Sequence, residues 1–180
     1  MLIELKWNTI KWLDFLNNNL IKDSRWLIWE IIPWWISNSF LDKKLWHIYT
    51  SIATWKYIAR WWHYHLKNID RFSTISWTAL WVFIDYRSWK KDVFSIILWN
   101  KKYDNSFWIE SYTIDNDYML TVKVPKKVYH LFVPLTDDYV TVFSLASEKH
   151  DDLDYVRISP FDIPEIKDLL DNFWIFDEKK

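Results

Sequence analysis

A series of short runs rich in Val, Ile, Tyr, Phe and Thr follows along the chain, with clusters of turn-forming residues between them. Strand-sized runs at a spacing of about 8–12 residues are typical of a β-sandwich or a β-barrel. The runs expected to form strands are 27–32, 47–53, 57–65, 72–76, 79–86, 93–98, 109–114, 119–124, 128–134 and 139–145. Near the end, Asp162 is expected to cap a short helix over about residues 163–173. The sequence therefore predicts an all-β fold with one short C-terminal helix.

The chain contains no Gly and 16 Trp, whereas average usage would make Gly about 7% of the residues. Trp89 lies between two strand-like runs and Trp174 follows the helical run, where turns and helix ends commonly need Gly. We hypothesise that most Trp stand at glycine positions of the natural protein, as when a UGA codon that an organism decodes as Gly is read as Trp. The alternative is a chain that is Trp-rich by nature, and the mass of the natural protein distinguishes the two. The functional interpretation does not rest on Trp.

Length and charge narrow the class of protein. The 180 residues are enough for one domain spanning 1–180, with its core over about residues 20–150. A net charge of -1 gives no reason to expect a nucleic-acid or anionic-membrane partner, and the absence of Cys excludes disulfides. No apolar run reaches the roughly 18 residues that span a membrane. A cytoplasmic protein is the expectation.

The sharpest motif is His63-Tyr64-His65, followed after four residues by Asp70. In a strand, residues i and i+2 point to the same face, so both imidazoles are expected to project together. A further imidazole, His130, follows the turn that begins at Pro125. Three imidazoles and a carboxylate suit a transition-metal site, for Zn or a similar divalent ion, with open positions. The alternative is a set of hydrogen-bonded histidines in a barrel mouth without metal.

These spacings resemble the two motifs of the cupin superfamily, His-x-His, three or four residues, Glu, six residues, Gly, and later Pro-x-Gly-x-x-His. The chain departs from them by Asp70 for Glu, Trp77 for Gly and Lys127 for Gly. The resemblance implies a cupin, or jelly-roll, β-barrel.

A narrower resemblance is to the sugar-nucleotide epimerases and isomerases of that superfamily, notably dTDP-4-dehydrorhamnose 3,5-epimerase. It rests on the segments 23–30 (Asp-x-Arg to Glu), 60–64 (Arg to His-Tyr), 85–87 (Asp-x-Arg) and 125–130 (Pro to His). It implies an isomerase that removes a proton beside the keto group of a dTDP- or UDP-linked 4-keto-6-deoxyhexose. Such an enzyme would serve surface-polysaccharide biosynthesis, require no cofactor and form a homodimer.

The resemblance also implies roles for individual residues. His63 matches the general base, and the side chains assigned to catalysis are His63, His65 and Tyr129. Those assigned to the substrate are Arg25, Glu30, Arg60 and His130. If a metal is bound by His63, His65, Asp70 and His130, another group such as Tyr129 or a bound water moves the proton. Asp85 and Arg87 are expected to form a structural pair at a strand end.

Two departures keep alternatives open. The epimerase has Gln where this chain has His65, and the His-Tyr-His form resembles the metal-binding cupin domain of capsular-polysaccharide epimerase/reductases. The epimerase also has a catalytic Tyr 19 positions after the second-motif His, where this chain has Lys149. The alternatives are a 3,4-ketoisomerase of the same substrate class, a non-catalytic metal- or sugar-binding cupin, and a metal-dependent cupin oxygenase or small-molecule isomerase.

Overall fold

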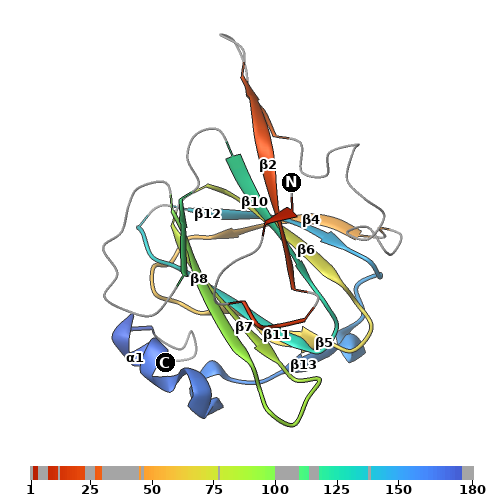
Figure 1. Ribbon diagram of the computed structural model, residues 1–180, viewed down its shortest axis with the longest axis vertical. Helices are drawn as coiled ribbons and strands as arrows, with labels where there is room; N and C mark the ends of the chain where they lie inside the picture. The colour runs from red at the N-terminus through yellow and green to blue at the C-terminus, as the bar shows by residue number, and fades with distance from the viewer. Residues whose placement is uncertain are drawn as a thin grey trace.

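The computed structural model describes residues 2–3, 8–11, 13–22, 27–29, 45, 47–76, 78–99, 110–113, 118–137 and 139–175. Its strands form two sheets that face each other (Figure 1). The first sheet contains β1 (Leu2–Ile3), β2 (Asp14–Lys22), β10 (Tyr118–Val124), β6 (Asp70–Ser76), β12 (Val140–Ala146) and β4 (His47–Ala53) in that order, and β3 (Leu27–Trp29) pairs with β2. The second contains β13 (Tyr155–Arg157), β5 (Arg60–His65), β11 (Val128–Pro134), β7 (Ala79–Asp85), β8 (Val93–Trp99) and β9 (Glu110–Thr113) in that order.

The predicted all-β fold is confirmed, and every expected run contains a strand. Described strand pairs are antiparallel except for β8 with β9. Three of the described strands were not expected, β1, β2 and β13. The middle of β2 is Asn17-Asn18-Asn19, and Asn is depleted in strands. The sequence of this segment therefore does not predict a strand, which forms because the segment pairs with β10.

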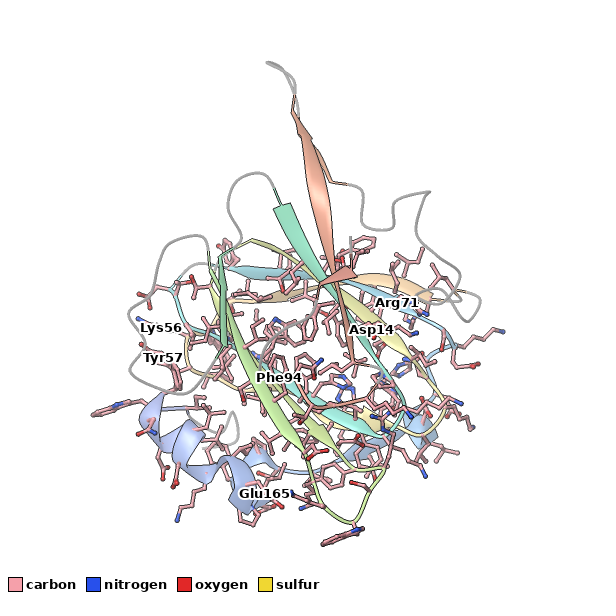
Figure 2. All side chains as sticks on the ribbon, viewed as in Figure 1. Asp14, Lys56, Tyr57, Arg71, Phe94 and Glu165 are labelled. Carbon is pink, nitrogen blue, oxygen red and sulfur yellow. The ribbon has the colours of Figure 1, made fainter. Side chains whose placement is uncertain are left out.

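The core between the sheets is largely aromatic. Trp81 and Phe83 of β7 pack there with Phe72, Phe94 and Phe132, and each is at most 2% exposed. Figure 2 shows Phe94 lying between the two sheets. Burying one such side chain contributes roughly 1.5–3 kcal/mol. The sheets are therefore held face to face by aromatic packing.

Strands β7 and β11 are buried along their whole length. Their outer face is covered by the C-terminal segment, which contributes Ile163, Ile166 and Leu170 to a second apolar cluster (Figure 1). Full burial on both faces explains why these two strands, apart from His130 and Asp85, are apolar on both faces rather than alternating.

The predicted helix over 163–173 is wrong in its extent. The segment contains the short 3-10 helices η2 (Pro160–Asp162) and η3 (Pro164–Ile166), and only then α1 (Lys167–Asn172). A residue before proline is disfavoured in the helical region, and Ile163 has φ −105° and ψ 103°. Asp162 is therefore part of η2 rather than the cap of a long helix.

Among the described residues, Tyr57, Lys127 and Trp174 have left-handed backbone, with φ of 62°, 58° and 54°. Lys127 stands at the glycine position of the second cupin motif, and Trp174 follows α1. Trp89, in the turn between β7 and β8, is 97% exposed. These positions have the backbone or the exposure expected of glycine positions, whereas Trp81 is an integral core residue.

No helix in the described part of the chain combines the length and the hydrophobicity needed to cross a membrane.

Candidate functional site

The three imidazoles of the motifs lie together on the inner face of the second sheet. Strand alternation turns His63 and His65 inward, while Trp62 and Tyr64 pack against the outer cluster. His130 of β11 is the register partner of His63. The ring centroid of His63 is 4.8 Å from that of His65 and 4.7 Å from that of His130. Pairing of β5 with β11 therefore joins the two motifs in one cluster.

Asp70 reaches this cluster from the opposite sheet, as the first residue of β6. Its Oδ2 atom is 2.9 Å from Nε2 of His65, which is an ion pair when that imidazole is protonated. Its Oδ1 atom accepts a 2.7 Å hydrogen bond from the Asn68 side chain. The side-chain oxygen Oδ1 of Asn68 in turn accepts from the backbone N–H of Ser147 at 2.8 Å. The site therefore spans the two sheets. The Asp70 carboxylate is held in place by Asn68, which lies in the buried turn before β6.

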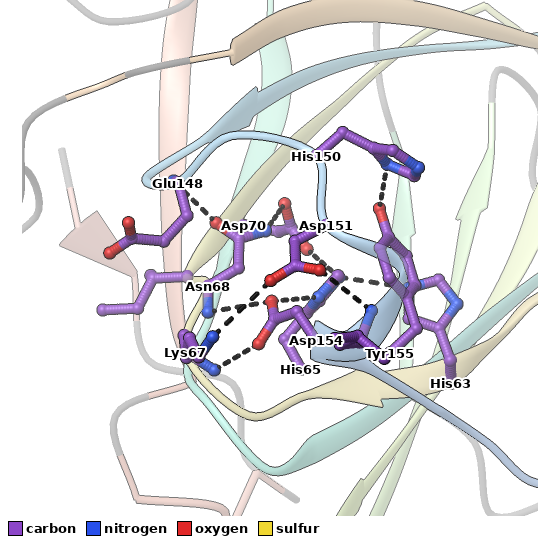
Figure 3. A network of polar contacts seen from close by, with 12 residues as sticks. His63, His65, Lys67, Asn68, Asp70, Glu148, His150, Asp151, Asp154 and Tyr155 are labelled. Atoms are coloured by element: carbon purple, nitrogen blue, oxygen red, sulfur yellow. Dashed lines mark hydrogen bonds and ion pairs between the residues drawn. The ribbon is translucent and has the colours of Figure 1, made fainter.

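Sequence reasoning missed two residues of the site, Asp154 and Tyr155, which Figure 3 shows beside the histidines. Asp154 ends the 3-10 helix η1 (Asp152–Asp154), and its Oδ2 atom is 2.9 Å from Nδ1 of His65. Tyr155 pairs with His65 across β13 and β5, and its ring lies 4.7 Å from His63 and 4.4 Å from His65. Its hydroxyl is 3.1 Å from Nδ1 of His150. Neither residue belongs to a motif, and only the pairing of β13 with β5 brings them here.

The surroundings of the three imidazoles shift their pKa values in different directions. Burial, with the nearby His130, His65 and Arg157, lowers the pKa of His63 far below its usual range. Burial likewise lowers the pKa of His130 to about 4. Burial alone would lower the pKa of His65 as well, but its contacts with Asp70 and Asp154 outweigh that effect and raise it. A positive charge is therefore favoured on His65 and disfavoured on His63 and His130.

The three histidines also have the arrangement of a metal site. One ligand nitrogen from each lies within 4.8 Å of the others. Nδ1 of His130 faces the carbonyl of Val128 at 3.2 Å and must donate to it, which leaves Nε2 as the nitrogen with a lone pair. That buried Nε2 has no hydrogen-bond partner. A ligand nitrogen without a partner, among three imidazoles, fits a divalent transition metal.

Tyr129, predicted from sequence to be catalytic, does not face the histidines. It neighbours His130 on β11, so its side chain points to the opposite face of the sheet and packs in the outer cluster. Its hydroxyl donates to the carbonyl of Ile158 at 3.1 Å. This geometry corrects the assignment, because the phenol that contacts the imidazoles is that of Tyr155.

The predicted substrate-binding residues are only partly described. Arg60 begins β5, and its guanidinium lies 5.5 Å from the ring of Trp55. Arg25 and Glu30 lie outside the described residues. The predicted strand-end pair is present, since Arg87 Nη2 is 2.6 Å from Asp85 Oδ2.

A polar cavity of about 420 Å³ lies next to the site. It is lined by Lys67, Glu148, Lys149, Asp151 and Asp154. Asp154 is therefore shared between this cavity and the contact with His65.

No family model and no curated protein matches the chain, but solved structures do. An RmlC epimerase from Mycobacterium tuberculosis is 17% identical, with a TM-score of 0.65 over 89% of this chain and 74% of that one. The dTDP-6-deoxy-D-glucose-3,5-epimerase of Legionella pneumophila Philadelphia 1, solved with dTDP-4-keto-L-rhamnose, is 15% identical, with a TM-score of 0.67 over 91% of this chain and 82% of that one.

A sugar 3,4-ketoisomerase from Thermoanaerobacterium thermosaccharolyticum, solved with TDP, is similar over 89% of this chain and 98% of that one, at 17% identity and a TM-score of 0.56. Both groups of enzymes named by the sequence resemblance are thus found among the similar structures. The chain has the cupin-like β fold of the dTDP-sugar 3,5-epimerases and related sugar isomerases.

Proposed function

We propose that the chain is an isomerase that epimerises a 4-keto-6-deoxyhexose linked to dTDP or UDP. The observation that carries the proposal is the buried pair of His63 and His65, whose nitrogens are 3.2 Å apart and whose pKa values shift in opposite directions. Proton transfer beside a carbonyl requires a neutral base to take the proton and a nearby positive charge to stabilise the oxygen. The opposite pKa shifts favour these two roles for His63 and His65. The fold shared with sugar-nucleotide epimerases supports the substrate class.

His63 is the general base of this proposal. Its lowered pKa keeps the imidazole neutral at pH 7, so a nitrogen lone pair is available. The base takes a proton from the carbon beside the keto group, and the C–H electron pair forms the carbon–carbon double bond of an enolate. The carbonyl oxygen then carries the negative charge, which the cationic His65 stabilises. Return of a proton to the opposite face of the carbon completes the epimerisation.

Tyr155 is the candidate for that returning proton. Burial, with the charge of Asp70, raises the pKa of Tyr155 to about 12, so its hydroxyl stays protonated. Its ring contacts both His63 and His65. The exposed side chain of His150, 3.1 Å from the phenol oxygen, connects it to solvent protons. Tyr155 thus takes the role that sequence reasoning gave to Tyr129.

In this proposal the protein binds its substrate through the nucleotide diphosphate. Arg25 and Arg60 remain the predicted ligands of the diphosphate, because guanidinium groups bind phosphate oxygens in pairs of charged hydrogen bonds. Glu30 remains the predicted acceptor of hydrogen bonds from the nucleotide base. Surface-polysaccharide biosynthesis in the cytoplasm and a homodimer remain part of the proposal.

A divalent metal ion at His63, His65 and His130 is a second candidate, favoured by the unpartnered Nε2 atom of His130. Asp70, in ionic contact with His65, is the predicted fourth ligand. When bound, the ion would supply Lewis-acid stabilisation of the enolate oxygen. Metal content after dialysis against Zn²⁺ tests this, with His130→Gln expected to lose the bound ion.

Isotope exchange tests the proposed function. The protein is incubated in D2O with dTDP- and UDP-linked 4-keto-6-deoxyhexoses, and NMR follows the protons at C3 and C5. An epimerase exchanges at least one of them and returns a 4-keto product, whereas a ketoisomerase yields a 3-keto product. Binding of the nucleotide sugar without exchange would favour a non-catalytic cupin over the proposal.

A further inference from the structure

We infer that Asp154 is a positioning residue for His63 and that it acts through His65. Three side chains form a series: Oδ2 of Asp154 is 2.9 Å from Nδ1 of His65, and Nε2 of His65 is 3.2 Å from Nε2 of His63 (Figure 3). Each nitrogen of the His65 ring is thus engaged by a different partner. The expected effect of Asp154 on turnover rests on the proposed function. The expected effect of Asp154 on the orientation of the rings is independent of that function.

The contact with Asp154 determines which nitrogen of His65 faces His63. A carboxylate oxygen accepts, so Nδ1 of His65 must donate to Asp154. The donor bond prevents the ring from flipping, because a flip would put a carbon in place of Nδ1 beside the carboxylate. Nε2 is thereby held towards His63, and towards Asp70 at 2.9 Å.

The carboxylate of Asp154 is itself rigidly held. It is 3% exposed, and its Oδ1 atom accepts a 2.6 Å hydrogen bond from the backbone N–H of Lys67. Oδ2 also accepts from the backbone N–H of Asn68 at 3.2 Å. These donors come from the turn that directly follows His65, so a shift of Asp154 cannot occur without disturbing that turn. Buried partners that orient a functional histidine in this way typically affect activity by about 10–100-fold.

Asp154→Asn separates positioning from folding. The amide keeps an oxygen for the N–H of Lys67 but turns an N–H towards Nδ1 of His65, which must then accept. Asp151→Asn is the matched control, because Asp151 caps the same 3-10 helix by accepting from the N–H of Leu153 and holds neither nitrogen of His65. Ser147→Ala is the stability control, because its hydroxyl supports the same turn through Ile69 without touching an imidazole.

The first readout is the ¹⁵N NMR pattern of histidine-labelled protein, which needs no substrate. In Asp154→Asn, Nδ1 of His65 should change from the protonated to the unprotonated type, and the ring signals of His63 should move with it. The second readout is deuterium exchange, where kcat should fall about 10–100-fold with KM changed less than about threefold. Asp151→Asn and Ser147→Ala should leave the ring signals as in wild type.

Two results would overturn the inference. One is an Asp154→Asn protein whose His63 signals are those of wild type. The other is a kcat loss that Ser147→Ala reproduces at the same loss of stability, because Asp154 would then act only on the fold. If the wild type exchanges no proton with any keto sugar, the proposed function fails, while the NMR comparison still decides whether Asp154 positions His63.

Discussion

His63 and His130 are register partners across β5 and β11, with their ring centroids 4.7 Å apart. Because side chains alternate between the faces of a strand, a slip of one residue would send one of the two imidazoles to the outer face. The register is secured by β11, whose remaining residues fill both the inner core and the outer cluster. The packing of the two apolar clusters therefore also assembles the site.

Replacing His63 by Ala should abolish exchange of the proton at C3 of the keto sugar. A general base typically contributes about 10²–10⁴-fold to the rate, so turnover should fall by that factor. Deuterium incorporation measured by NMR gives the rate, and a fluorescence or calorimetric titration with the nucleotide gives the affinity. The affinity should change little, because His63 is not among the residues predicted to bind the diphosphate.

Arg25→Ala is the complementary variant, since loss of charged hydrogen bonds to the diphosphate should weaken nucleotide binding and leave the chemistry intact. Wild-type exchange in His63→Ala would show that His63 is not the base and would favour a structural or metal-binding role.

The two motifs made part of the site predictable from sequence. His-x-His predicts two imidazoles on one face for any strand, and the later motif adds His130 once β11 pairs with β5. Asp154 was not predictable, because its contact with His65 joins positions 89 residues apart through a 3-10 helix with no sequence signature. Tyr129 was misassigned because sequence proximity to His130 does not place two side chains on the same face of a strand.

Tyr155→Phe and Tyr129→Phe should have opposite effects. Tyr155→Phe removes the hydroxyl proposed to return the proton, so exchange should slow by about 10²-fold or more with little change in stability. Tyr129→Phe removes a partly buried hydrogen bond to Ile158 and should lower the free energy of unfolding by about 1 kcal/mol with activity unchanged. Exchange rates and urea unfolding of the two variants check this. An inactive Tyr129→Phe that is folded would restore the sequence-based assignment.

Stability should fall on both sides of neutral pH. His130 has its pKa lowered to about 4 in the folded protein, so the unfolded chain binds a proton first as the pH drops below the ordinary histidine value of about 6.5. Stability is then lost between about pH 6.5 and 4, by roughly 3 kcal/mol. His63, with its pKa also lowered, acts in the same direction.

His65 acts in the opposite direction because its pKa is raised in the folded protein. Its contribution is fully present below about pH 6.5 and is lost as the pH rises through its folded value. Urea unfolding between pH 4 and 9 measures both limbs. His65→Gln should flatten the alkaline limb and His130→Gln the acid limb. A pH-independent free energy of unfolding would contradict the assignment of charge to His65.

Glycine substitutions should separate turn positions from core positions. Lys127 and Trp174 have φ of 58° and 54°, and left-handed backbone costs a residue with a Cβ atom about 1–2 kcal/mol. Part of the gain is offset because Gly loses more conformational entropy on folding. Lys127→Gly and Trp174→Gly should therefore each raise the free energy of unfolding by about 1 kcal/mol, measured by urea unfolding.

Trp81→Gly should have the reverse effect. Trp81 is 1% exposed, stacks on Phe72 and Phe132, and donates from its indole N–H to Thr74. Removing so large a buried side chain leaves a cavity and costs about 3–5 kcal/mol or more. If Lys127→Gly and Trp174→Gly stabilise the protein and Trp81→Gly destabilises it, glycine is favoured at positions with positive φ and not in the core. A neutral Trp81→Gly would instead show that the core accommodates glycine there, as the hypothesis of misread glycine codons requires if it extends to this position.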